Sequence, residues 1–523
     1  MASLERDFVL GFFCELRVVT SLASTQLTRI TLRKTADEDG TATVARAEVF
    51  GTELIPGVPV QLPPGRSLSV FTSTGCTLTV LAPPSVLQRC YATSSGTTWV
   101  RSLLDFHSHL ERARVEARSR VDVGPRVLFV SDRHHCGLST YIRWLSNFAV
   151  RLGYHPLLVD GVLDAPAFTY PGCIGLYSLQ YCADIEEEMN LTPALHVLVG
   201  QARSANPRLY LHWLQQLLPL GLEKMARSER CRVGGLFFDY GVVDPNVVTQ
   251  AEEAAGAGGG PTTFSSSAAG STGAPSGSEK TLVNPVDTLL DAIVAADIDH
   301  VCVVGSAWLR WKLVQRAWER YGGEGSMDIV QAMLDPRWTV PPEVDCGGGQ
   351  HFKLFLMDSV ELVRQIPLPL VTRQRWLQYF FGTPSSPVKP TLVTLEASQV
   401  RVATVGAAAL DAMSTLLPMM DSEEEGRQKA DTAAVSFVTL KDVNLKDRLL
   451  ALSTATEYER SADGELHRLP YSAFERAIRQ STVMGFVLVE SASSDRLTLL
   501  VNGCTLDKDI GLCFLLTEEY LKS

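Results

Sequence analysis

The chain has 523 residues, 46% of them hydrophobic and 20% charged, which is enough for several packed domains and excludes a largely disordered protein. Its net charge of −11 argues against a broad basic surface that binds nucleic acid regardless of sequence. The eleven cysteines contain no C-x-x-C pair and no apolar run approaches the ~20 residues of a membrane span, so we expect a soluble intracellular protein with reduced thiols and no structural zinc.

The N-terminal part, residues 1–100, predicts a series of short strands. The β-forming runs lie at residues 8–19, 27–33, 47–50, 67–72 and 77–81, with Pro/Gly-rich turns between them. Regular spacing of this kind is typical of a small β-sandwich or barrel. A polar connecting helix is expected over residues 101–123, where four arginines alternate with glutamates and are interpreted as a solvated face: Arg112, Arg114, Arg118 and Arg120.

The pattern changes at residue 124, where an α/β domain is expected to begin and to run to residue 388. An apolar run at 127–130 predicts a buried parallel strand, and apolar residues at helical spacing follow over 141–152. A second buried strand is expected at 156–160, which completes a βαβ unit. Further strands are expected at 235–238 and 301–304.

Two stretches interrupt the regular pattern. Residues 251–280 consist largely of Ala, Gly, Ser, Thr and Pro, so we expect a disordered insertion over 248–282. A second flexible stretch is expected at 421–425. Strand-like runs resume at 434–440, 485–490, 497–501 and 512–517, and predict a small β-rich α+β domain over 389–523. The expected fold class is α/β, with a central parallel-sheet domain between an N-terminal β-sandwich or barrel and this C-terminal domain.

The loop after the first α/β strand carries the clearest chemical signal. A phosphate-binding loop reads G-x-x-x-x-G-K-[ST] at this junction, because glycines let backbone N–H groups surround the phosphates, the lysine neutralises them and the hydroxyl holds Mg²⁺. Here an aspartate stands at the first glycine and a leucine at the lysine, while the second glycine and the hydroxyls are present. The candidate phosphate site is therefore a degenerate P-loop in a P-loop NTPase-like domain, made of Asp132, Arg133, Gly137, Leu138, Ser139 and Thr140.

The loss of the lysine limits what this loop can do. Removing one preorganised charge contact from a transition state costs ~3–4 kcal/mol, or two to three decades of rate. Arg133 or His134 could supply a replacement charge, and Asp132 would repel phosphate unless its carboxylate turns away. Three readings stay open: nucleotide binding without transfer, catalysis with relocated charges, and a plain turn between strand and helix.

Other candidate residues have simpler structural explanations. The His-His-Cys segment at 134–136 has no further ligand near it in the sequence, so a surface loop is favoured over a metal site. Asp160 and Asp239 each end a predicted strand, where a carboxylate can hold Mg²⁺ or water, although a turn or cap is the preferred interpretation. The aromatic pair at 380–381 could stack on bases but fits a core pair better.

Short segments spread along the chain resemble one known family, in that family's own order. The sequences A-E-V-F-G-T-E-L, F-T-S-T-G-C, F-T-Y-P-G-C-I and Y-F-F-G stand at residues 47–54, 71–76, 168–174 and 379–382. They are similar to motifs of the Clp-type RNA 5′-hydroxyl kinases, which supply a subunit of the pre-mRNA cleavage factor. The F-G-T-E-L element points to the cleavage factor branch of that family.

This resemblance implies a nuclear protein of pre-mRNA 3′-end cleavage and polyadenylation. The partners that it implies are a scaffold subunit of the cleavage factor that contacts RNA polymerase II, other polyadenylation factors and, indirectly, RNA. Some relatives join the tRNA splicing endonuclease instead. Active members of the family use ATP with Mg²⁺ to phosphorylate RNA 5′-hydroxyls.

The sequence departs from the family where the chemistry takes place. Besides Leu138, the family's L-D-x-x-Q, T-x-G-W and D-Q-E-R elements read G-V-L-D-A at 161–165, D-Y-G-V at 239–242 and G-S-A-W at 305–308. Several such losses together should disable phosphoryl transfer. We therefore expect a non-catalytic, partner-binding subunit in which ATP with Mg²⁺ is at most a retained ligand; an active kinase and a tRNA-splicing factor are the alternatives.

Overall fold

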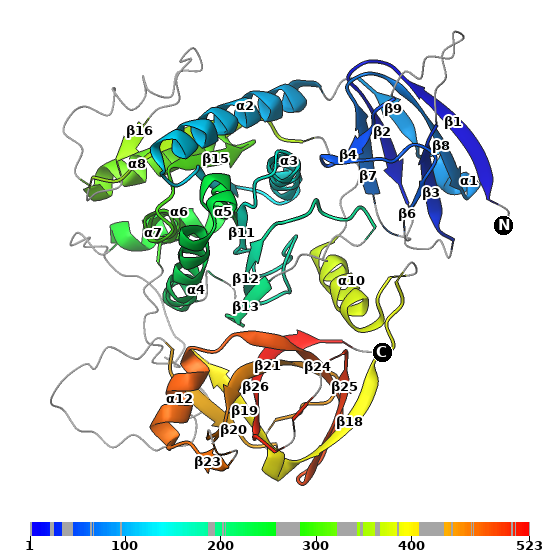
Figure 1. The fold of residues 1–523 in the computed structure, drawn as a ribbon. Coiled ribbons are helices and arrows are strands. Elements are labelled where there is room, and N and C mark those ends of the chain that lie inside the picture. Colours follow the sequence, from blue (N-terminus) through cyan, green and yellow to red (C-terminus); the bar gives the residue numbers. More distant parts are fainter. Residues whose placement is uncertain are drawn as a thin grey trace, which may run out of the picture.

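The computed structural model has three bodies in chain order: a β-sandwich, an α/β domain and a β-rich domain (Figure 1). This arrangement confirms the expected fold class. The structure describes residues 3–20, 26–33, 45–62, 65, 67–94, 97–186, 194–200, 203, 206–257, 283–321, 343–345, 349–360, 367–383, 386–406, 433–440, 443–461, 463, 465–503, 506–507 and 509–521.

The N-terminal domain consists of two packed antiparallel sheets, with strand orders β1-β8-β3-β6 and β5-β4-β7-β2-β9. Alternate residues of the strands point inward and are fully buried between the sheets, as expected for a sandwich. The β-forming run at 8–19 contains parts of two strands, because the chain turns at residues 11–13. The elements are β1 (Leu4–Leu10), β2 (Cys14–Val19), β3 (Thr28–Leu32), β4 (Glu48–Val49), β5 (Thr52–Glu53), β6 (Pro59–Leu62), β7 (Ser67–Thr72), β8 (Cys76–Ala82), α1 (Pro84–Leu87) and β9 (Tyr91–Thr93).

The connecting helix α2 (Thr97–Arg120) lies along the central domain and buries one stripe of side chains. Arg114 belongs to that stripe, at helical spacing from Leu103, Phe106 and Leu110, and none of its surface is exposed. Its guanidinium lies over the ring of Tyr154 at 5.2 Å. The interpretation of all four arginines as a solvated face is therefore wrong for Arg114, because helical periodicity turns this position inward.

The central domain is built on an eight-stranded sheet of order β13-β12-β11-β14-β10-β15-β17-β16. The inner strands β11, β14, β10, β15 and β17 are parallel, and β12, β13 and β16 pair antiparallel at the edges. The strands are β10 (Arg126–Ser131), β11 (Leu157–Asp160), β12 (Cys173–Ser178), β13 (Ala194–Leu198), β14 (Leu236–Val242), β15 (His300–Val304), β16 (Glu343–Asp345) and β17 (His351–Met357).

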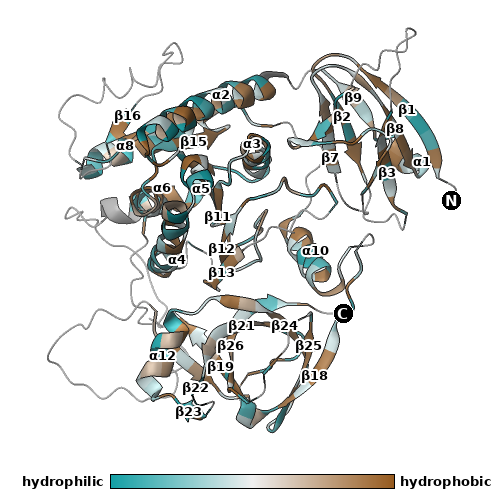
Figure 2. Ribbon diagram, viewed as in Figure 1, coloured by the Kyte–Doolittle hydropathy of each residue, from teal (hydrophilic) through white to brown (hydrophobic). Residues whose placement is uncertain are grey.

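Helices cover both faces of this sheet, so its strands read as continuous apolar runs. One face packs on α2 and on α3 (Leu138–Arg151), and the other on α4 (Pro207–Arg227), α7 (Pro285–Ala295) and α8 (Ala307–Tyr321). Figure 2 shows brown, apolar stretches in the sheet, and helices in which brown and teal residues alternate. The remaining helices are α5 (Glu229–Gly234), α6 (Pro245–Ala257) and α10 (Leu368–Phe381).

The first part of the expected disordered insertion is helical in the structure. Helix α6 continues to Ala257, so it covers the first part of the stretch 248–282. The rest of that stretch and the stretch 421–425 lie outside the described residues. None of the described helices is long and apolar enough to cross a membrane.

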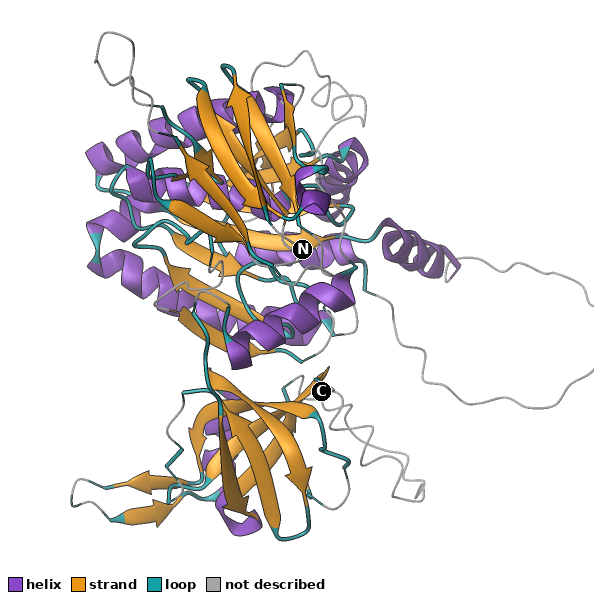
Figure 3. Cartoon of the chain, turned by 90° about the vertical axis from the view of Figure 1, so that its right-hand side faces the viewer, coloured by secondary structure: helices purple, strands orange, loops and turns teal. Residues whose placement is uncertain are grey.

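The C-terminal domain is a strongly curved seven-stranded sheet of order β18-β25-β24-β21-β26-β19-β20. It lies below the central domain in Figure 3. Trp376 and Phe380 of α10 are buried at the junction, where the ring of Trp376 lies 4.8 Å from that of Phe486. The elements are β18 (Thr391–Glu396), η1 (Ala397–Gln399), β19 (Val400–Val405), β20 (Val435–Val438), β21 (Arg448–Thr456), β22 (Tyr458–Arg460), β23 (Leu466–Arg468), α12 (Tyr471–Arg479), β24 (Val483–Ala492), β25 (Arg496–Val501) and β26 (Leu512–Tyr520).

The F-G-T-E-L segment fastens the N-terminal domain to α3, the helix that follows the candidate phosphate loop. Gly51 has a φ of 83° and lies so close to α3 that a Cβ atom there would be 3.2 Å from the Cβ of Asn147. The Asn147 amide donates to the carbonyl of Phe50 at 2.7 Å and to the hydroxyl of Thr52 at 3.1 Å. Its oxygen accepts the backbone N–H of Ala183 at 2.9 Å.

Replacing Asn147 with alanine is expected to lower the free energy of unfolding by ~1–3 kcal/mol, because partners in a buried site are left without their hydrogen bonds. Urea denaturation followed by fluorescence measures this loss. Asn246→Ala, at an exposed position of α6, is the control and should change the free energy by less than ~0.5 kcal/mol. Equal effects of the two variants would contradict a role of Asn147 in joining the domains.

Candidate functional site

The candidate loop joins β10 to α3 at the carboxyl end of the parallel strands, where α/β domains bind their ligands. Gly137 precedes the helix with a φ of 99°, a conformation that favours glycine. The eight consecutive residues 133–140 of the loop and helix line a cavity of about 270 Å³ here, together with α10 and residues 165–167. The structure brings all the predicted loop residues except Asp132 to this cavity: Arg133, Gly137, Leu138, Ser139 and Thr140.

Gly137 is held closely by the segment that follows β17. A Cβ atom at Gly137 would lie 2.4 Å from a methyl group of Val360. The backbone N–H of Val360 donates to the carbonyl of Cys136 at 2.9 Å. The carbonyl of Asp358 accepts from the Tyr141 hydroxyl at 2.7 Å, and its carboxylate accepts from Ser102 at 2.9 Å. These contacts fix the loop backbone from the side of β17.

Leu138 stands where a P-loop lysine would, and it is part of the hydrophobic core. Only 8% of its surface is exposed, and it belongs to the apolar cluster between α2, α3 and the sheet. The side chain therefore contributes packing and no charge. The function expected of that position, neutralising phosphate oxygens, is absent from this residue.

Asp132 turns its carboxylate away from the loop. Its Oδ2 accepts from the hydroxyl of Ser306 at 2.5 Å, and that hydroxyl accepts in turn the backbone N–H of Leu309 at the start of α8. The positive end of the helix dipole favours a carboxylate there. Arg133 points to the same turn and donates to the carbonyl of Gly305 at 3.0 Å. The repulsion of phosphate expected from Asp132 is thereby reduced, and the replacement charge expected from Arg133 is turned to a backbone oxygen.

Ser139 and Asp239 form the contact that pairs a P-loop hydroxyl with a strand carboxylate. The Ser139 hydroxyl donates to Oδ2 of Asp239 at 3.2 Å. Asp239 lies inside β14 with 1% of its surface exposed, and its Oδ1 has no hydrogen-bond partner among the residues that the structure describes. The preferred interpretation of Asp239 as a turn or cap residue is therefore wrong. An unpartnered buried carboxyl oxygen beside a cavity indicates a site for a polar ligand or a cation.

Asp160 and Asp239 are adjacent across β11 and β14, and both are buried. Asp160 accepts the backbone N–H groups of Val162, Phe168 and Thr169 at 3.1, 2.7 and 3.0 Å. Burial raises the pKa of both carboxyl groups, and burial together with the neighbouring Asp160 raises the pKa of Asp239 to about 8. Because three N–H donors stabilise the ionised form of Asp160, the proton of this pair resides on Asp239 at neutral pH. Asp160 thus also orders the loop that follows β11.

Arg375 of α10 is a cation at this cavity that the sequence analysis did not identify. It lines the cavity and donates to the carbonyl of Ala167 at 3.0 Å, and its charge opposes in part the burial that raises the pKa of Asp160. The sequence contains a signal for Arg375, because this arginine precedes the Y-F-F-G segment by one helical turn.

The aromatic pair of the Y-F-F-G segment is only partly buried. Phe380 is fully buried, which confirms the core interpretation, whereas Phe381 is 46% exposed.

The segment 134–136 forms no metal site of its own. Cys136 is buried and His134 is exposed, so their side chains diverge. Within the described ranges, no three His, Cys, Asp or Glu side chains converge to hold a metal. His134 instead lies between the loop cavity and a second cavity of about 190 Å³ lined by Asp164, Arg203 and Tyr240.

The residues present fit ATP with Mg²⁺ only in part. The unpartnered oxygen of Asp239 and the hydroxyl of Ser139 are suitable ligands for Mg²⁺, and the first N–H groups of α3 can face phosphate. Arg375 supplies the charge of the cavity wall. No P-loop lysine would neutralise the transferred phosphate, because Leu138 occupies that position and its side chain is buried in the core.

Comparisons with known proteins agree with this arrangement. A family model of the mRNA cleavage and polyadenylation factor CLP1 P-loop matches residues 133–244, and a model of the N-terminal beta-sandwich domain of polyadenylation factor matches residues 15–117. Protein CLP1 homolog of Nematostella vectensis is 33% identical over 192 residues, which are 36% of this chain and 44% of that protein. Polyribonucleotide 5′-hydroxyl-kinase Clp1 of Xenopus tropicalis is 34% identical over 190 residues, 36% of this chain and 42% of that protein.

The matched part thus spans less than half of the length of these curated relatives. Solved structures extend the similarity in fold to the whole chain. A wild-type Clp1p–Pcf11p complex matches with a TM-score of 0.66 at 15% identity, over 99% of both chains. A second structure, which concerns the Pcf11p–Clp1p interface and the loss of ATP in a point mutant, has a TM-score of 0.67.

Proposed function

We propose, because the chain belongs to the Clp1 family, that it is a non-catalytic subunit of the nuclear machinery for pre-mRNA 3′-end cleavage and polyadenylation. In this role it binds partner proteins on its folded domains, and its degenerate P-loop serves at most to hold a nucleotide. This role does not include phosphoryl transfer.

The observation that carries the proposal is the place of Leu138 in the hydrophobic core. Phosphoryl transfer depends on positioning and on charge stabilisation, and the P-loop lysine supplies both. A leucine that is nine-tenths buried can supply neither. Contacts between the N-terminal domain and α3 are present at the same time, through Asn147 and Gly51.

A bound nucleotide would be held by contacts that do not involve Asp132. Ser139 and Asp239 would face Mg²⁺, the amides at the start of α3 would face phosphate, and Arg375 would contribute charge. Mg²⁺ with ATP would supply a polyanionic ligand that joins the loop to α10. In that case ATP would act as a structural ligand.

A protein that resembles Pcf11p is the partner that the fold supports best, because the matching solved structures contain Clp1p bound to Pcf11p. Affinity purification of the tagged chain from nuclear extract tests this. Polyadenylation factors should be recovered in stoichiometric amounts. Recovery of the tRNA splicing endonuclease in their place would support the tRNA-splicing alternative and reject the proposed pathway.

The nucleotide content of the purified protein tests the state of the loop. The protein is denatured, and released ATP or ADP is quantified by chromatography. One nucleotide per chain would mean that the loop still holds phosphates, and that ATP is a structural ligand. No nucleotide would mean that partner binding relies on the protein domains alone.

An active RNA 5′-hydroxyl kinase is the second candidate, favoured by one observation. Ser139, Asp239 and Arg375 surround the same cavity and retain metal ligands and a positive charge. Transfer of phosphate to RNA that is abolished by Ser139→Ala would establish this activity.

A further inference from the structure

The end of the central domain opposite the phosphate loop is built from three helix ends. The last turns of α2, the end of α4 and the whole of α5 meet there. The backbone N–H of Gly124 donates to the carbonyl of Arg232 at 2.8 Å, and that of His155 donates to the carbonyl of Arg230 at 3.0 Å. Arg232 also donates to the carbonyl of Asp122 at 2.9 Å. These bonds hold residues from distant parts of the sequence in one continuous surface.

This surface is positively charged in a protein that is acidic as a whole. Residues 111–122 and 223–232 contain eight arginines and lysines and five acidic residues, a net charge of +3, whereas the chain carries −11. Four ion pairs neutralise part of it: Arg114, which is buried, with Glu111, Arg120 with Glu116, Arg227 with Glu223, and Arg118 with Glu229. Four cations make no ion pair with a carboxylate among the described residues: Arg112, Lys224, Arg230 and Arg232.

Helix dipoles account for only part of this charge. The carboxyl end of a helix carries about half a negative charge, and cations in its last turn compensate it. Lys224 and Arg232 lie in the last turns of α4 and α5 and serve in this way. Arg112 lies in the middle of α2 and Arg230 in the first turn of α5, where the dipole gives them no such role. Positive charge is therefore left over.

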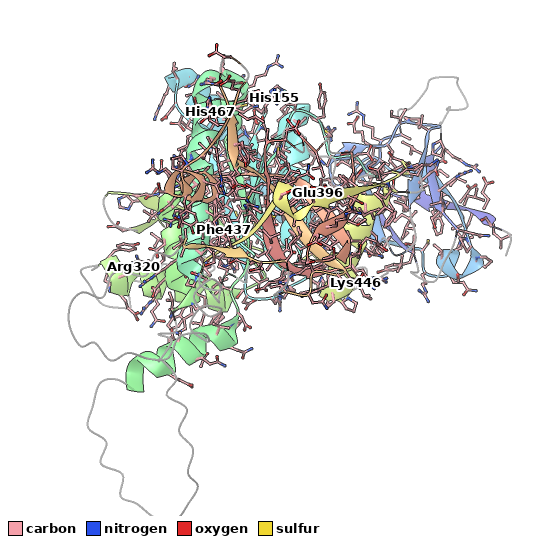
Figure 4. All side chains as sticks on the ribbon, turned by 90° about the horizontal axis from the view of Figure 1, so that it is seen from below. His155, Arg320, Glu396, Phe437, Lys446 and His467 are labelled. Atoms are coloured by element: carbon pink, nitrogen blue, oxygen red, sulfur yellow. The ribbon has the colours of Figure 1, made fainter. Side chains whose placement is uncertain are left out.

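The groups around His155 show the same excess of positive charge. His155 lies at the upper margin of the molecule in Figure 4, beside the start of β11. Burial lowers the pKa of His155, and the nearby Arg230 and Lys224 lower it further. The side chains of Arg112 and Arg230 are exposed and can reach a ligand.

We propose that this surface, formed by Arg112, Arg118, Arg120, Lys224, Arg230 and Arg232, binds the phosphodiester backbone of single-stranded RNA. Guanidinium groups donate two parallel hydrogen bonds to a phosphate, which suits a surface where arginine outnumbers lysine five to one. A flexible single strand can follow an irregular row of cations. Because the surface faces away from the loop cavity, it would hold a strand during assembly without presenting its end for phosphorylation.

Fluorescence anisotropy of the full chain with a labelled oligouridine, titrated from low to physiological salt, tests the proposal. The affinity of the wild-type protein should fall with salt, since binding releases counterions from RNA. Lys224→Gln/Arg230→Gln should bind more than about tenfold more weakly at low salt. It should also reduce the slope of log K against log salt by about 1.4, or ~0.7 for each lost phosphate contact.

The matched control removes the same charge from the C-terminal domain. Arg476 and Arg496 are exposed there, and Arg476→Gln/Arg496→Gln should bind RNA within about twofold of the wild-type protein. Equal losses in both variants would reduce the effect to overall charge and overturn the proposal. So would absence of RNA binding, or binding of polyglutamate with the same dependence on Lys224 and Arg230, which would identify a surface for acidic protein segments.

Discussion

Replacing Gly137 with alanine is expected to lower the free energy of unfolding by ~2–5 kcal/mol. A positive φ costs an L-residue ~1–2 kcal/mol, and overpacking costs a further ~1–3 kcal/mol. Both terms apply, because φ is 99° and the new methyl group would lie 2.4 Å from Val360. Chemical denaturation monitored by circular dichroism measures the loss.

The chain offers a control that separates the two terms. Gly153 also has a positive φ, 85°, but apart from its chain neighbours no atom of the described residues lies within 4 Å of a Cβ placed there. Gly153→Ala should therefore show only the backbone cost of ~1–2 kcal/mol. Adding Val360→Ala to Gly137→Ala should recover the overpacking part. If the two glycine variants lose the same stability, residues 358–360 do not hold the loop as the structure describes.

Replacing Asp239 with asparagine is expected to stabilise the protein, and to do so by more at pH 8 than at pH 5. The pKa of Asp239 is about 8 in the folded state, raised by burial and by Asp160, and 3.8 is its ordinary value. Between these values the folded protein holds a proton that the unfolded chain has released. Stability of the wild-type protein therefore falls as pH rises, by up to ~1.4 kcal/mol for each pH unit in that window, and levels off above pH 8.

Asparagine does not ionise, so the variant does not lose stability in this way. The difference between the free energies of unfolding of the two proteins should therefore grow from pH 5 to pH 8. Thermal unfolding at several pH values measures the difference. Asp105→Asn, at an exposed position of α2, should leave the profile unchanged. A variant that is less stable than wild type at every pH would mean that Asp239 contributes structure through its charge.

A carboxyl group that destabilises its own fold is typical of a site retained for a ligand. Asp239 fits this description, because it is buried, leaves one oxygen unpartnered and adjoins a cavity. The same residue would serve Mg²⁺ in the nucleotide-bound state. Leu138 differs from Asp239, because it stabilises the fold by packing in the core and supplies no positive charge for phosphoryl transfer.

Much of the fold could be predicted from the sequence, because its signals are local. The apolar runs at 127–130 and 301–304 are buried strands, and the apolar spacing over 141–152 is α3. Charge alone predicts a surface position for Arg114, whereas its place on the inner stripe of α2 puts it in the core. The turn at 11–13 has only a weak signal in the sequence, because it contains two phenylalanines in addition to Gly11.

The site could be predicted only as far as one loop reaches. Its members from Arg133 to Thr140 are consecutive, so the motif places them together. Asp239 and Arg375 join the loop through the order of strands in the sheet and the packing of α10, which a single sequence does not display. The turn of Asp132 toward Ser306 depends in the same way on the neighbouring strand β15.

Transfer of the γ-phosphate from ATP to RNA with a 5′-hydroxyl end tests the central claim most directly. The purified full chain is incubated with labelled ATP and RNA, beside its Ser139→Ala variant and an active polynucleotide kinase. We predict that the wild-type chain labels RNA no faster than the Ser139→Ala variant does. Labelling that is well above the variant and disappears with Ser139→Ala would contradict the account and identify the chain as an enzyme.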